Sequence, residues 1–418
     1  MRKNKRLDIA VIGGGAAGVF GAVACAESAE VPVTIRLFEA GGACLRKARI
    51  AGGGRCNLTH HCQSVNDFCQ NYPRGARELL GPMRAFGPAE TVTWFETRGV
   101  PLKTERDGRV FPASDTAAEI VNCLLAEADK AGVRIDTAVE VTELRPSPDG
   151  GFDVRTGTAR AWRFDKVLLA LGGGAPKAYA LVRRLDHTVT LPAPALFGLK
   201  TEDGAFHHLA GLAVPDCDLS LPDLKVSSRG PMLFTQWGIT GPAALKLSSL
   251  AAKTLQARGY KTPLRINYCP ALKSTEVDQF LQRTSQTKGA GKVRNSPLFN
   301  LPSRLWKGLA ARAGIHPDLP WSRLSGGQRQ ALVAVLTACP SSIQGKAPSR
   351  EEMVTAGGVT LSEVNFKTME SKIHPGLHIA GELLDIDGLT GGFNLQAAWT
   401  TGYLAGVAMG LAPFHLKE

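Results

Sequence analysis

The sequence LDIAVIGGGAAGVFGAVACAESAEVPVTIRLFEAG, from Leu7 to Gly41, contains the strongest structural pattern in the chain. It begins with an apolar run that ends in three glycines, which predicts a buried parallel strand entering a tight turn. Residues 16–29 have helical composition, and the β-branched run Val33 to Phe38 predicts a second strand, closed by Glu39. Strand, glycine turn, helix, strand and acid follow in the order of a βαβ unit that binds a dinucleotide.

Three glycines in this stretch match the G-x-G-x-x-G pattern of dinucleotide-binding turns. Gly13 permits the turn, Gly15 lets the backbone approach a pyrophosphate, and Gly18 lets helix and strand pack closely. The helix N-terminus presents unpaired N–H groups to the phosphates. Glu39, 21 residues beyond Gly18, is placed to accept a hydrogen bond from the adenosine ribose.

The length and composition are those of an ordinary soluble protein of two or three domains. The chain has 418 residues, of which 44% are hydrophobic and 21% are charged. No apolar run approaches the ~20 residues that a membrane-spanning helix needs, and the basic N-terminus enters the glycine turn without a signal-peptide cleavage site. Nine scattered cysteines without a C-x-x-C pair indicate reduced thiols. We therefore expect a cytoplasmic protein that does not associate with membranes.

The net charge of +12 is confined to one segment. Residues 195–350 contain 20 Lys and Arg against 8 Asp and Glu, whereas the rest of the chain contains 29 of each sign. A surplus held in one module fits an electrostatic footprint for a polyanion such as RNA. A solvated basic face without a partner explains the surplus equally well, so both interpretations stay open.

Two helices and a further strand are predicted in the first half of the chain. Residues 76–98 and 116–131 have the pattern of amphipathic helices, and Ser114 or Asp115 is placed to cap the second. KVLLALGGGAP (166–176) reads as a buried strand that lacks the full glycine spacing and a following helix with an acid. It should therefore close the first cofactor-binding half rather than begin a second nucleotide domain.

The middle of the chain has the pattern of an insert. From Pro194 the sequence turns to proline-rich, short β-like pieces, and from Ser274 it becomes helical and basic. LSGGQRQALVAVL (324–336) resembles an ATPase signature, but no P-loop accompanies it, so we predict a turn entering a helix. The predicted division is a dinucleotide-binding domain over 1–193 and 353–418, with an insert over 194–352 that is β-rich over 194–273 and helical over 274–352.

The loop GGGRCN (52–57) brings backbone N–H groups, the cation Arg55 and the thiol Cys56 together, although a flexible loop without function is the alternative. The cysteines and histidines of this region do not match the ligand spacing of a metal site, so we predict none. These residues are Cys56, His60, His61, Cys62 and Cys69.

Four motifs together resemble the BaiN/RdsA-type family of NAD(P)/FAD-dependent flavoproteins, also called YhiN-like. They are GGGAAG (13–18), GGGRCNLT (52–59), LFTQWGITGPAAL (233–245) and AGELLDIDGLTGGFNLQAAWTTG (380–402). The resemblance covers almost the whole chain. It implies an α/β fold with a Rossmann-like FAD-binding domain that is discontinuous, because a β-rich plus helical domain is inserted into it.

The resemblance also implies the positions of the cofactor. The ADP half of FAD is expected against residues 13–18 and Glu39, and the isoalloxazine near the loop 53–57 and the helix start at 392–395. The residues expected to bind FAD are Gly13, Gly15, Ala16, Ala17, Gly18, Glu39, Ala40, Gly53, Gly54, Asn57, Val141, Gly172, Gly381, Glu382, Asp387, Gly392, Phe393, Asn394 and Leu395.

Family activities imply reduction of an activated C=C bond, with NAD(P)H as a transient reductant. The substrate is either a small steroid-type enone or a uridine of ribosomal RNA. Flavin N5 delivers hydride to an electron-poor carbon, and a protein acid protonates its neighbour. A thiol of ordinary pKa stays protonated at neutral pH, so Cys56 is the candidate acid, although it could equally only pack against the flavin. Arg55 is placed to stabilise an enolate-like oxygen.

A non-catalytic alternative is a flavin-bearing RNA-binding or assembly factor, which would bind flavin without turning over any acceptor. If RNA is bound, phosphate contacts should provide most of the affinity because aromatic residues are sparse in the helical part of the insert. The candidate phosphate contacts are Lys288, Lys292, Arg294, Arg304 and Lys307.

Overall fold

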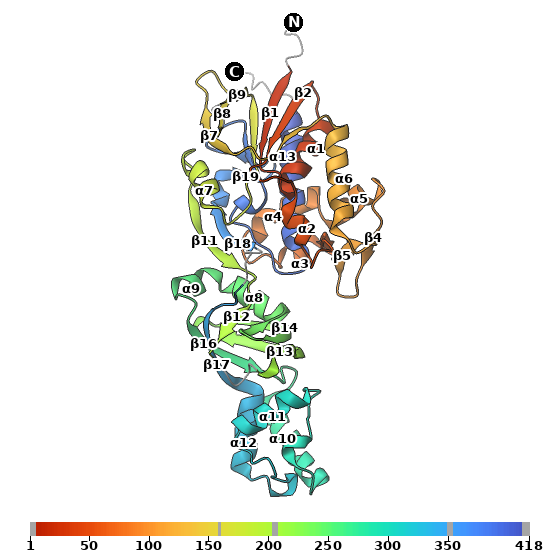
Figure 1. The fold of residues 1–418 in the computed structure, drawn as a ribbon, viewed down its shortest axis with the longest axis vertical. Helices are drawn as coiled ribbons and strands as arrows, with labels where there is room; N and C mark the ends of the chain where they lie inside the picture. Colours follow the sequence, from red (N-terminus) through yellow and green to blue (C-terminus); the bar gives the residue numbers. More distant parts are fainter. Residues whose placement is uncertain (1–5, 158–159, 203–207, 349–353, 412–418) are drawn as a thin grey trace. The chain divides into compact units, whose positions relative to one another are not determined.

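The computed structural model describes residues 6–157, 160–202, 208–348 and 354–411. These residues form two compact units. Unit 1 contains the described residues up to Ala193 and from Val354 onward, and unit 2 contains those between them. Each unit has its own hydrophobic core. In Figure 1 the blue C-terminal segment lies beside the red N-terminal elements inside unit 1.

The core of unit 1 is a seven-stranded sheet in the order β19-β20-β21-β10-β1-β2-β6. Its parallel strands are β21 (Leu377–Ile379), β10 (Lys166–Leu169), β1 (Leu7–Ile12), β2 (Val33–Phe38) and β6 (Arg134–Asp136), and the antiparallel edge is β20 (Glu370–Ser371) with β19 (Val364–Asn365). The buried runs of β1 and β10 form its centre, as expected for strands covered on both faces. Because β10 pairs with β21, both chain segments share one sheet. The predicted α/β, Rossmann-like and discontinuous fold is confirmed.

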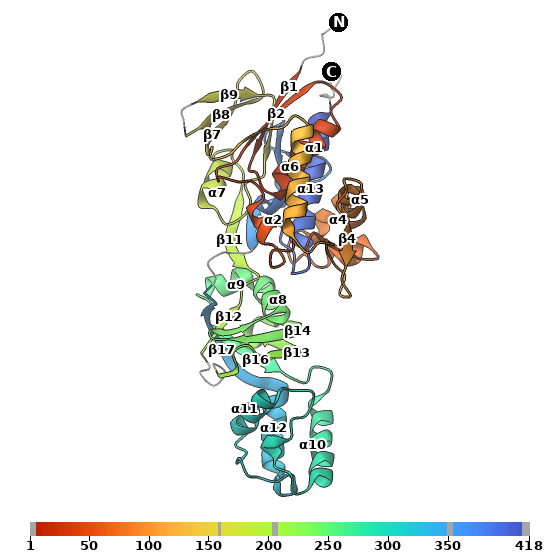
Figure 2. The same ribbon diagram turned by 45° about the vertical axis from the view of Figure 1, so that its right-hand side comes forward.

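Two helices of one sheet face pack through glycines. Helix α1 (Ala16–Glu27) lies against α13 (Phe393–Gly410), and both views show them side by side (Figures 1 and 2). A Cβ atom at Gly402 would lie less than 3.0 Å from the carbonyl oxygen of Ala17, and one at Gly406 would be as close to that of Gly21. Only glycine therefore permits this approach of the two backbones.

Lys166 fixes the far end of α13. Its Nζ donates hydrogen bonds to the carbonyl oxygens of Ala408 (3.3 Å), Met409 (2.9 Å) and Leu411 (3.0 Å). These carbonyls have no partner within the helix, and the ammonium also opposes the negative end of the helix dipole. The first residue of β10 thus fixes the C-terminus of α13, the helix whose N-terminus faces the candidate site.

Smaller elements surround the sheet. One group is a β-meander of β7 (Val141–Pro146), β8 (Phe152–Thr156) and β9 (Ala161–Phe164), and another is the sheet β3 (Thr59–His60), β5 (Arg109–Pro112) and β4 (Leu102–Thr104). The helices are α2 (Arg46–Ile50), α3 (Val65–Cys69), α4 (Ala76–Ala85), α5 (Pro88–Glu96), α6 (Ala117–Lys130) and α7 (Pro176–Arg183), and β11 (Val189–Ala195) pairs with β18 (Val354–Val359).

Unit 2 consists of a closed six-stranded barrel and helices. The barrel order is β12-β15-β14-β13-β16-β17, with β12 (Leu199–Thr201), β13 (Ala213–Leu221), β14 (Val226–Thr235), β15 (Gly238–Thr240), β16 (Thr262–Asn267) and β17 (Cys339–Lys346). The helices are α8 (Pro242–Leu250), α9 (Ala252–Ala257), α10 (Ser274–Lys288), α11 (Ser303–Arg312) and α12 (Gly326–Ala338). α12 begins at the glycine pair, where the Ser325 side chain accepts a hydrogen bond from Gln328 N, so the turn predicted there is confirmed.

Four local predictions differ from the structure. The helix predicted over 76–98 is broken into α4 and α5, because Gly87 and Pro88 start a new helix. The cap of α6 is Thr116, whose hydroxyl accepts from Ala118 N at 3.4 Å, rather than Ser114 or Asp115. A helix, α7, does follow the glycines after β10. Finally, the segment predicted as helical over 274–352 ends in β17, which closes the barrel.

Candidate active site

The predicted cofactor residues gather at one edge of the unit 1 sheet. β1, β2, β10 and β21 are parallel, so the turns that follow their C-terminal ends lie at the same edge. These turns begin with Gly13, Glu39, Ala170 and Ala380, and Gly172 and Gly381 follow the last two. Ligands of open α/β sheets bind at this edge.

The turn between β1 and α1 leaves room for a ligand at the helix N-terminus. Gly13 has φ +111°, and a Cβ there would lie less than 3.0 Å from the carbonyl of Ala170. A Cβ at Gly18 would meet the carbonyl of Gly13, so the helix packs closely on the turn. Gly15, at the helix cap, has no atom within 4 Å of its Cβ position. The backbone at Gly15 is therefore open to a ligand, and the N-terminus of α1 that follows it is suited to a pyrophosphate.

Glu39 is held in place by backbone N–H groups on both sides. Its Oε2 accepts a hydrogen bond from Gly14 N, and its Oε1 accepts one from Gly41 N, both at 2.7 Å. A carboxylate oxygen has two lone-pair positions, so each oxygen retains capacity for a ribose hydroxyl. Exposed Ala40 follows it in the chain. Half-buried Val141, which starts β7, comes two residues after Val139, whose N–H donates to the carbonyl oxygen of Glu39 at 2.9 Å.

The C-terminal segment reaches this edge through Gly381 and Glu382. A Cβ at Gly381, where φ is +72°, would lie 2.9 Å from the Cβ of Ala17 in the first turn of α1. The Glu382 carboxylate accepts hydrogen bonds from Thr355 N (2.8 Å) and from Lys47 Nζ (2.6 Å). Glu382 thus joins three distant chain segments beside the turn.

The N-terminus of α13 is tied to the loop 52–57. With its amide nitrogen directed at the carbonyls of Val110 (3.3 Å) and Thr59 (3.1 Å), Asn57 accepts a hydrogen bond from Gly392 N at 3.0 Å. Asn394 closes the preceding turn, because its side chain accepts from Gly388 N and donates to Gly388 O, both at 2.8 Å. Buried Phe393 and half-buried Leu395 complete this helix start. Exposed Gly53 and Gly54 have positive φ and open Cβ positions in the facing loop.

Cys56 is fully buried and has φ +60°. Burial raises the pKa of its thiol to about 12, so the thiol is protonated throughout the neutral range. A protonated thiol suits a proton donor. The residue has 0% exposed surface, so a substrate can reach the thiol only after the loop moves.

Arg55 lies in a cluster of opposite charges. Its Nη1 is 2.7 Å from Glu105 and 3.1 Å from Asp115, and its guanidinium lies 3.9 Å from the centroid of the Phe111 ring. The hydrogen bond to Glu105 is the main cause that raises the pKa of Arg55. The cation is thus shared with two carboxylates, which reduces what it can supply to a developing oxyanion.

Asp387 differs from the other predicted residues because it serves the core. Its side chain has no exposed surface, and both oxygens accept hydrogen bonds from the Arg74 guanidinium. A buried carboxylate paired in this way is costly to separate from its partner, and it has no exposed surface for a ligand.

Two neighbours of the site were missed by sequence reasoning. Lys47 pairs with Glu382 across 335 positions of sequence, so no local signal announces it. The sequence around His60 does not fit a metal site and indicates no other role for this residue. Its ring stacks on Phe393 at 5.0 Å, and its Nδ1 lies 3.1 Å from the carbonyl oxygen of Gly391. Burial lowers its pKa, so the imidazole is neutral at the start of α13.

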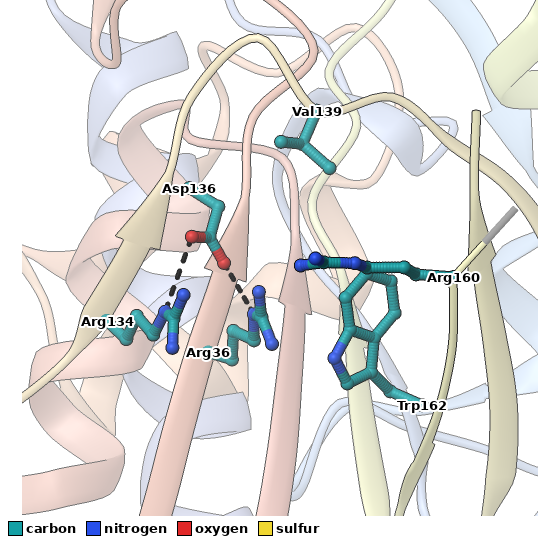
Figure 3. Close-up of a pocket in the computed structure, with 6 residues that line it drawn as sticks. All are labelled: Arg36, Arg134, Asp136, Val139, Arg160 and Trp162. Atoms are coloured by element: carbon teal, nitrogen blue, oxygen red, sulfur yellow. Dashed lines mark hydrogen bonds and ion pairs between the residues drawn. The ribbon is translucent and has the colours of Figure 1, made fainter. Parts of the chain in front are cut away.

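A separate pocket lies between strands β2 and β6 of the sheet and the β-meander (Figure 3). In it Arg36 pairs with Asp136 and lies 4.5 Å from the ring centroid of Trp162. Arg134, Val139 and Arg160 complete the lining, and none of these residues belongs to the predicted cofactor set. Within the described parts of the chain, no group of three or more His, Cys, Asp or Glu could hold a metal, and no helix is long and apolar enough to cross a membrane.

Taken together, the residues fit FAD. An open helix N-terminus, an acid at the end of β2 and a second glycine-flanked helix start meet at one sheet edge. When bound, the flavin would supply hydride-transfer chemistry at this edge.

The comparisons with known proteins match nearly the whole chain. A family model described as the HI0933-like protein Rossmann domain matches residues 7–408. The chain is 32% identical to a 3-dehydro-bile acid delta(4,6)-reductase from Clostridium scindens, covering 97% of this chain and 99% of that protein. It is 27% identical to a ribosomal RNA dihydrouridine synthase from Escherichia coli, covering 96% and 97%.

Solved structures show the same fold at low identity. The E. coli quinol fumarate reductase FrdA has a TM-score of 0.50 and 14% identity, covering 97% of this chain and 70% of that chain. A 3-ketosteroid delta1-dehydrogenase from Sterolibacterium denitrificans has a TM-score of 0.50 and 10% identity, covering 98% and 100%.

Proposed function

The chain belongs to the HI0933-like Rossmann-domain family and is an FAD-dependent oxidoreductase, and we propose that it reduces a C=C bond conjugated to a carbonyl group. The observation that supports this most is the 32% identity, over 97% of the chain, to a reductase of a 3-dehydro-bile acid. The second relative makes dihydrouridine. An enone and a uracil ring share one reactive unit, since in both the C=C bond is polarised by a neighbouring carbonyl. One catalytic arrangement therefore suits both substrate classes.

The proposed cofactor contacts are the turn at residues 13–18, Glu39, the segment around Gly381 and the start of α13. Gly15 N and the following N–H groups are suited to bind phosphate oxygens, and the Glu39 carboxylate to bind the ribose. Gly392 and the loop 52–57, joined by Asn57, should hold the ring system at its edge. These assignments rest on the open positions and fixed side chains at the sheet edge.

The proposed proton donor is Cys56. Reduction of a conjugated C=C bond requires a proton at the carbon next to the carbonyl. The burial that raises the thiol pKa to about 12 keeps that proton in place, although it also makes the thiol a weak acid. Arg55 is the proposed stabiliser of the carbonyl oxygen, and Glu105 and Asp115 orient it.

NAD(P)H is the proposed reductant. The described residues contain one sheet with a complete dinucleotide-binding turn, which we assign to FAD. The turn after β10 is followed by α7 but lacks the spacing of the first. NAD(P)H should therefore bind briefly where the substrate also binds.

Two candidate substrates remain, a small enone and ribosomal RNA, and the positive charge of unit 2 favours the RNA. The small enone is supported by the higher identity. Ribosomal RNA is supported by the second relative and by the charge of residues 195–350, with 20 cations against 8 acids. Phosphate contacts would come from unit 2.

The deciding experiment compares both substrates with one protein preparation. The FAD-loaded protein and NADPH are incubated with a 3-oxo-4-ene steroid, and the steroid is then analysed by mass spectrometry. In a second incubation the acceptor is ribosomal RNA from a strain that lacks the gene for this protein, and the nucleosides of that RNA are analysed in the same way. We expect reduction of at least one C=C bond, with dihydrouridine appearing if RNA is the substrate. Bound flavin without turnover of either acceptor would instead favour the flavin-bearing binding or assembly factor.

A further inference from the structure

The helical part of unit 2 has few acids, and two of them, Glu276 and Asp278, lie near the start of α10. Residues 279–317 contain seven Lys and Arg and no Asp or Glu. Three of these cations have partners in the structure: Lys292 pairs with Asp318 (2.7 Å), Arg304 donates to the carbonyl of His208, and Arg312 donates to that of Pro340. Arg283, Lys288, Arg294 and Lys307 form no ion pair with the residues that the structure describes. Of these, Arg283 and Lys288 on α10 and Arg294 are exposed, and Lys307 is half-buried.

An aromatic side chain is exposed among these cations. Phe280, on α10, retains 46% of its surface exposure, which is unusual for a ring of this size. Its ring centroid lies 4.9 Å from that of Phe299, which packs against the core of unit 2. Arg283 follows one turn later on the same helix, so its guanidinium lies on the same side as Phe280.

The segment that carries Phe299 has a strained backbone. Phe299 and Asn300 both have φ of +54°. A bulky residue in the left-handed region is a true outlier, and such strain persists where the surrounding structure or a function requires it. The two rings meet at a tilt, with an interplanar angle of 47°.

We propose that Phe280, supported by Phe299 and flanked by Arg283 and Lys288, forms a stacking site for an unpaired base of an RNA strand. The inference rests on the ribosomal RNA candidate of the proposed function. An exposed ring provides a face for a base, and neighbouring cations contact the phosphates. In this site α10 of unit 2 binds the RNA strand. Base stacking on Phe280 then adds to the phosphate contacts expected from charge alone.

The test measures binding of the full-length, FAD-loaded protein to two labelled probes. One is an oligouridine of about twelve nucleotides, a length in the range of single-strand sites, and the other is the same backbone without bases. Fluorescence anisotropy gives Kd at KCl concentrations from roughly 50 to 200 mM. The variants are Phe280→Ala, Phe280→Trp and Arg283→Ala, with Leu272→Ala as the matched control because Leu272 is also exposed, at 36%.

We expect Phe280→Ala to weaken oligouridine binding roughly ten-fold and to leave the abasic probe unaffected, whereas Phe280→Trp keeps parental affinity. Arg283→Ala should weaken both probes and reduce the salt slope of log Kd by about 0.7. The stacking site would be overturned if Phe280→Ala weakened binding of both probes equally. It would also be overturned if Leu272→Ala weakened oligouridine binding as much as Phe280→Ala does. Such a surface would suit a protein partner. Steroid reduction should be unchanged in Phe280→Ala. Base-dependent binding without any reductase activity would contradict the proposed function and leave the stacking site in place.

Discussion

Glu39 accepts a hydrogen bond from the backbone N–H of Gly14 at 2.7 Å, so the acid at the end of β2 is fixed against the turn that precedes α1. Its other oxygen is held by Gly41 N at the same distance. The side chain is thus oriented before any ribose arrives, which lowers the entropy cost of binding.

Replacing Glu39 by Ala should weaken FAD binding by about 1.5–3 kcal/mol, the range for a hydrogen bond to a charged group. The measurement is a titration of apoprotein with FAD, together with mass spectrometry of the flavin released from the parent protein. Glu140→Ala is the control, since Glu140 is an exposed acid paired with Lys177. Release of FMN, or unchanged FAD affinity in Glu39→Ala, would contradict the assignment.

The packing of α1 on α13 should not tolerate side chains at its glycines. In Gly402→Ala the new Cβ would lie less than 3.0 Å from the Ala17 carbonyl, so the backbones must separate. We expect a loss of about 1–3 kcal/mol in the free energy of unfolding, measured with urea. Gly81→Ala in α4 is the control, because no atom lies within 4 Å of its Cβ position and alanine favours the helix by about 0.5–1 kcal/mol. Equal stability of the two variants would show that the backbones of α1 and α13 can move apart without a loss of stability.

Asp387 should behave as a core residue. Asp387→Asn removes the buried negative charge that pairs with the Arg74 guanidinium, and breaking a buried pair costs about 3–5 kcal/mol. We expect a large fall in the urea midpoint. The FAD affinity of the folded fraction should stay within a few-fold of the parent. A variant of parental stability that has lost FAD would restore Asp387 to the cofactor site.

Local patterns were enough to predict the parallel core and the glycine turn, but not the contacts that assemble the site. The run Leu7–Ile12 and its glycines carry their own signal, because burial on both faces and a tight turn each restrict residue type. Asn57 and Gly392 are far apart in sequence, and nothing near either position announces the hydrogen bond between them. β17 was missed because its sequence, CPSSIQGK, is polar and does not alternate, although it pairs with β12 on one side and β16 on the other.

The buried thiol of Cys56 should make stability fall at alkaline pH. Its pKa is raised by burial from 9.0 to about 12, so the native state holds the proton more tightly than the unfolded state. The stabilisation is complete below about pH 9 and is lost as pH rises toward 12, at up to about 1.4 kcal/mol per pH unit for one thiol. In urea unfolding between about pH 8 and pH 10, the free energy of unfolding of Cys56→Ala should therefore change less with pH than that of the parent protein. An unchanged pH dependence in Cys56→Ala would contradict this prediction.

The kinetics should show that NAD(P)H and the acceptor use one position in turn. Unit 1 offers one complete dinucleotide turn, at residues 13–18, and FAD is expected to occupy it. The oxidised nicotinamide must then leave before the acceptor enters, which gives ping-pong kinetics. Initial rates at several acceptor concentrations should yield parallel double-reciprocal lines against NADPH. Calorimetric titration of the oxidised protein with NADP⁺ should detect no tight complex. Intersecting lines, or a tight NADP⁺ complex that forms while a substrate analogue is bound, would require a second nucleotide site.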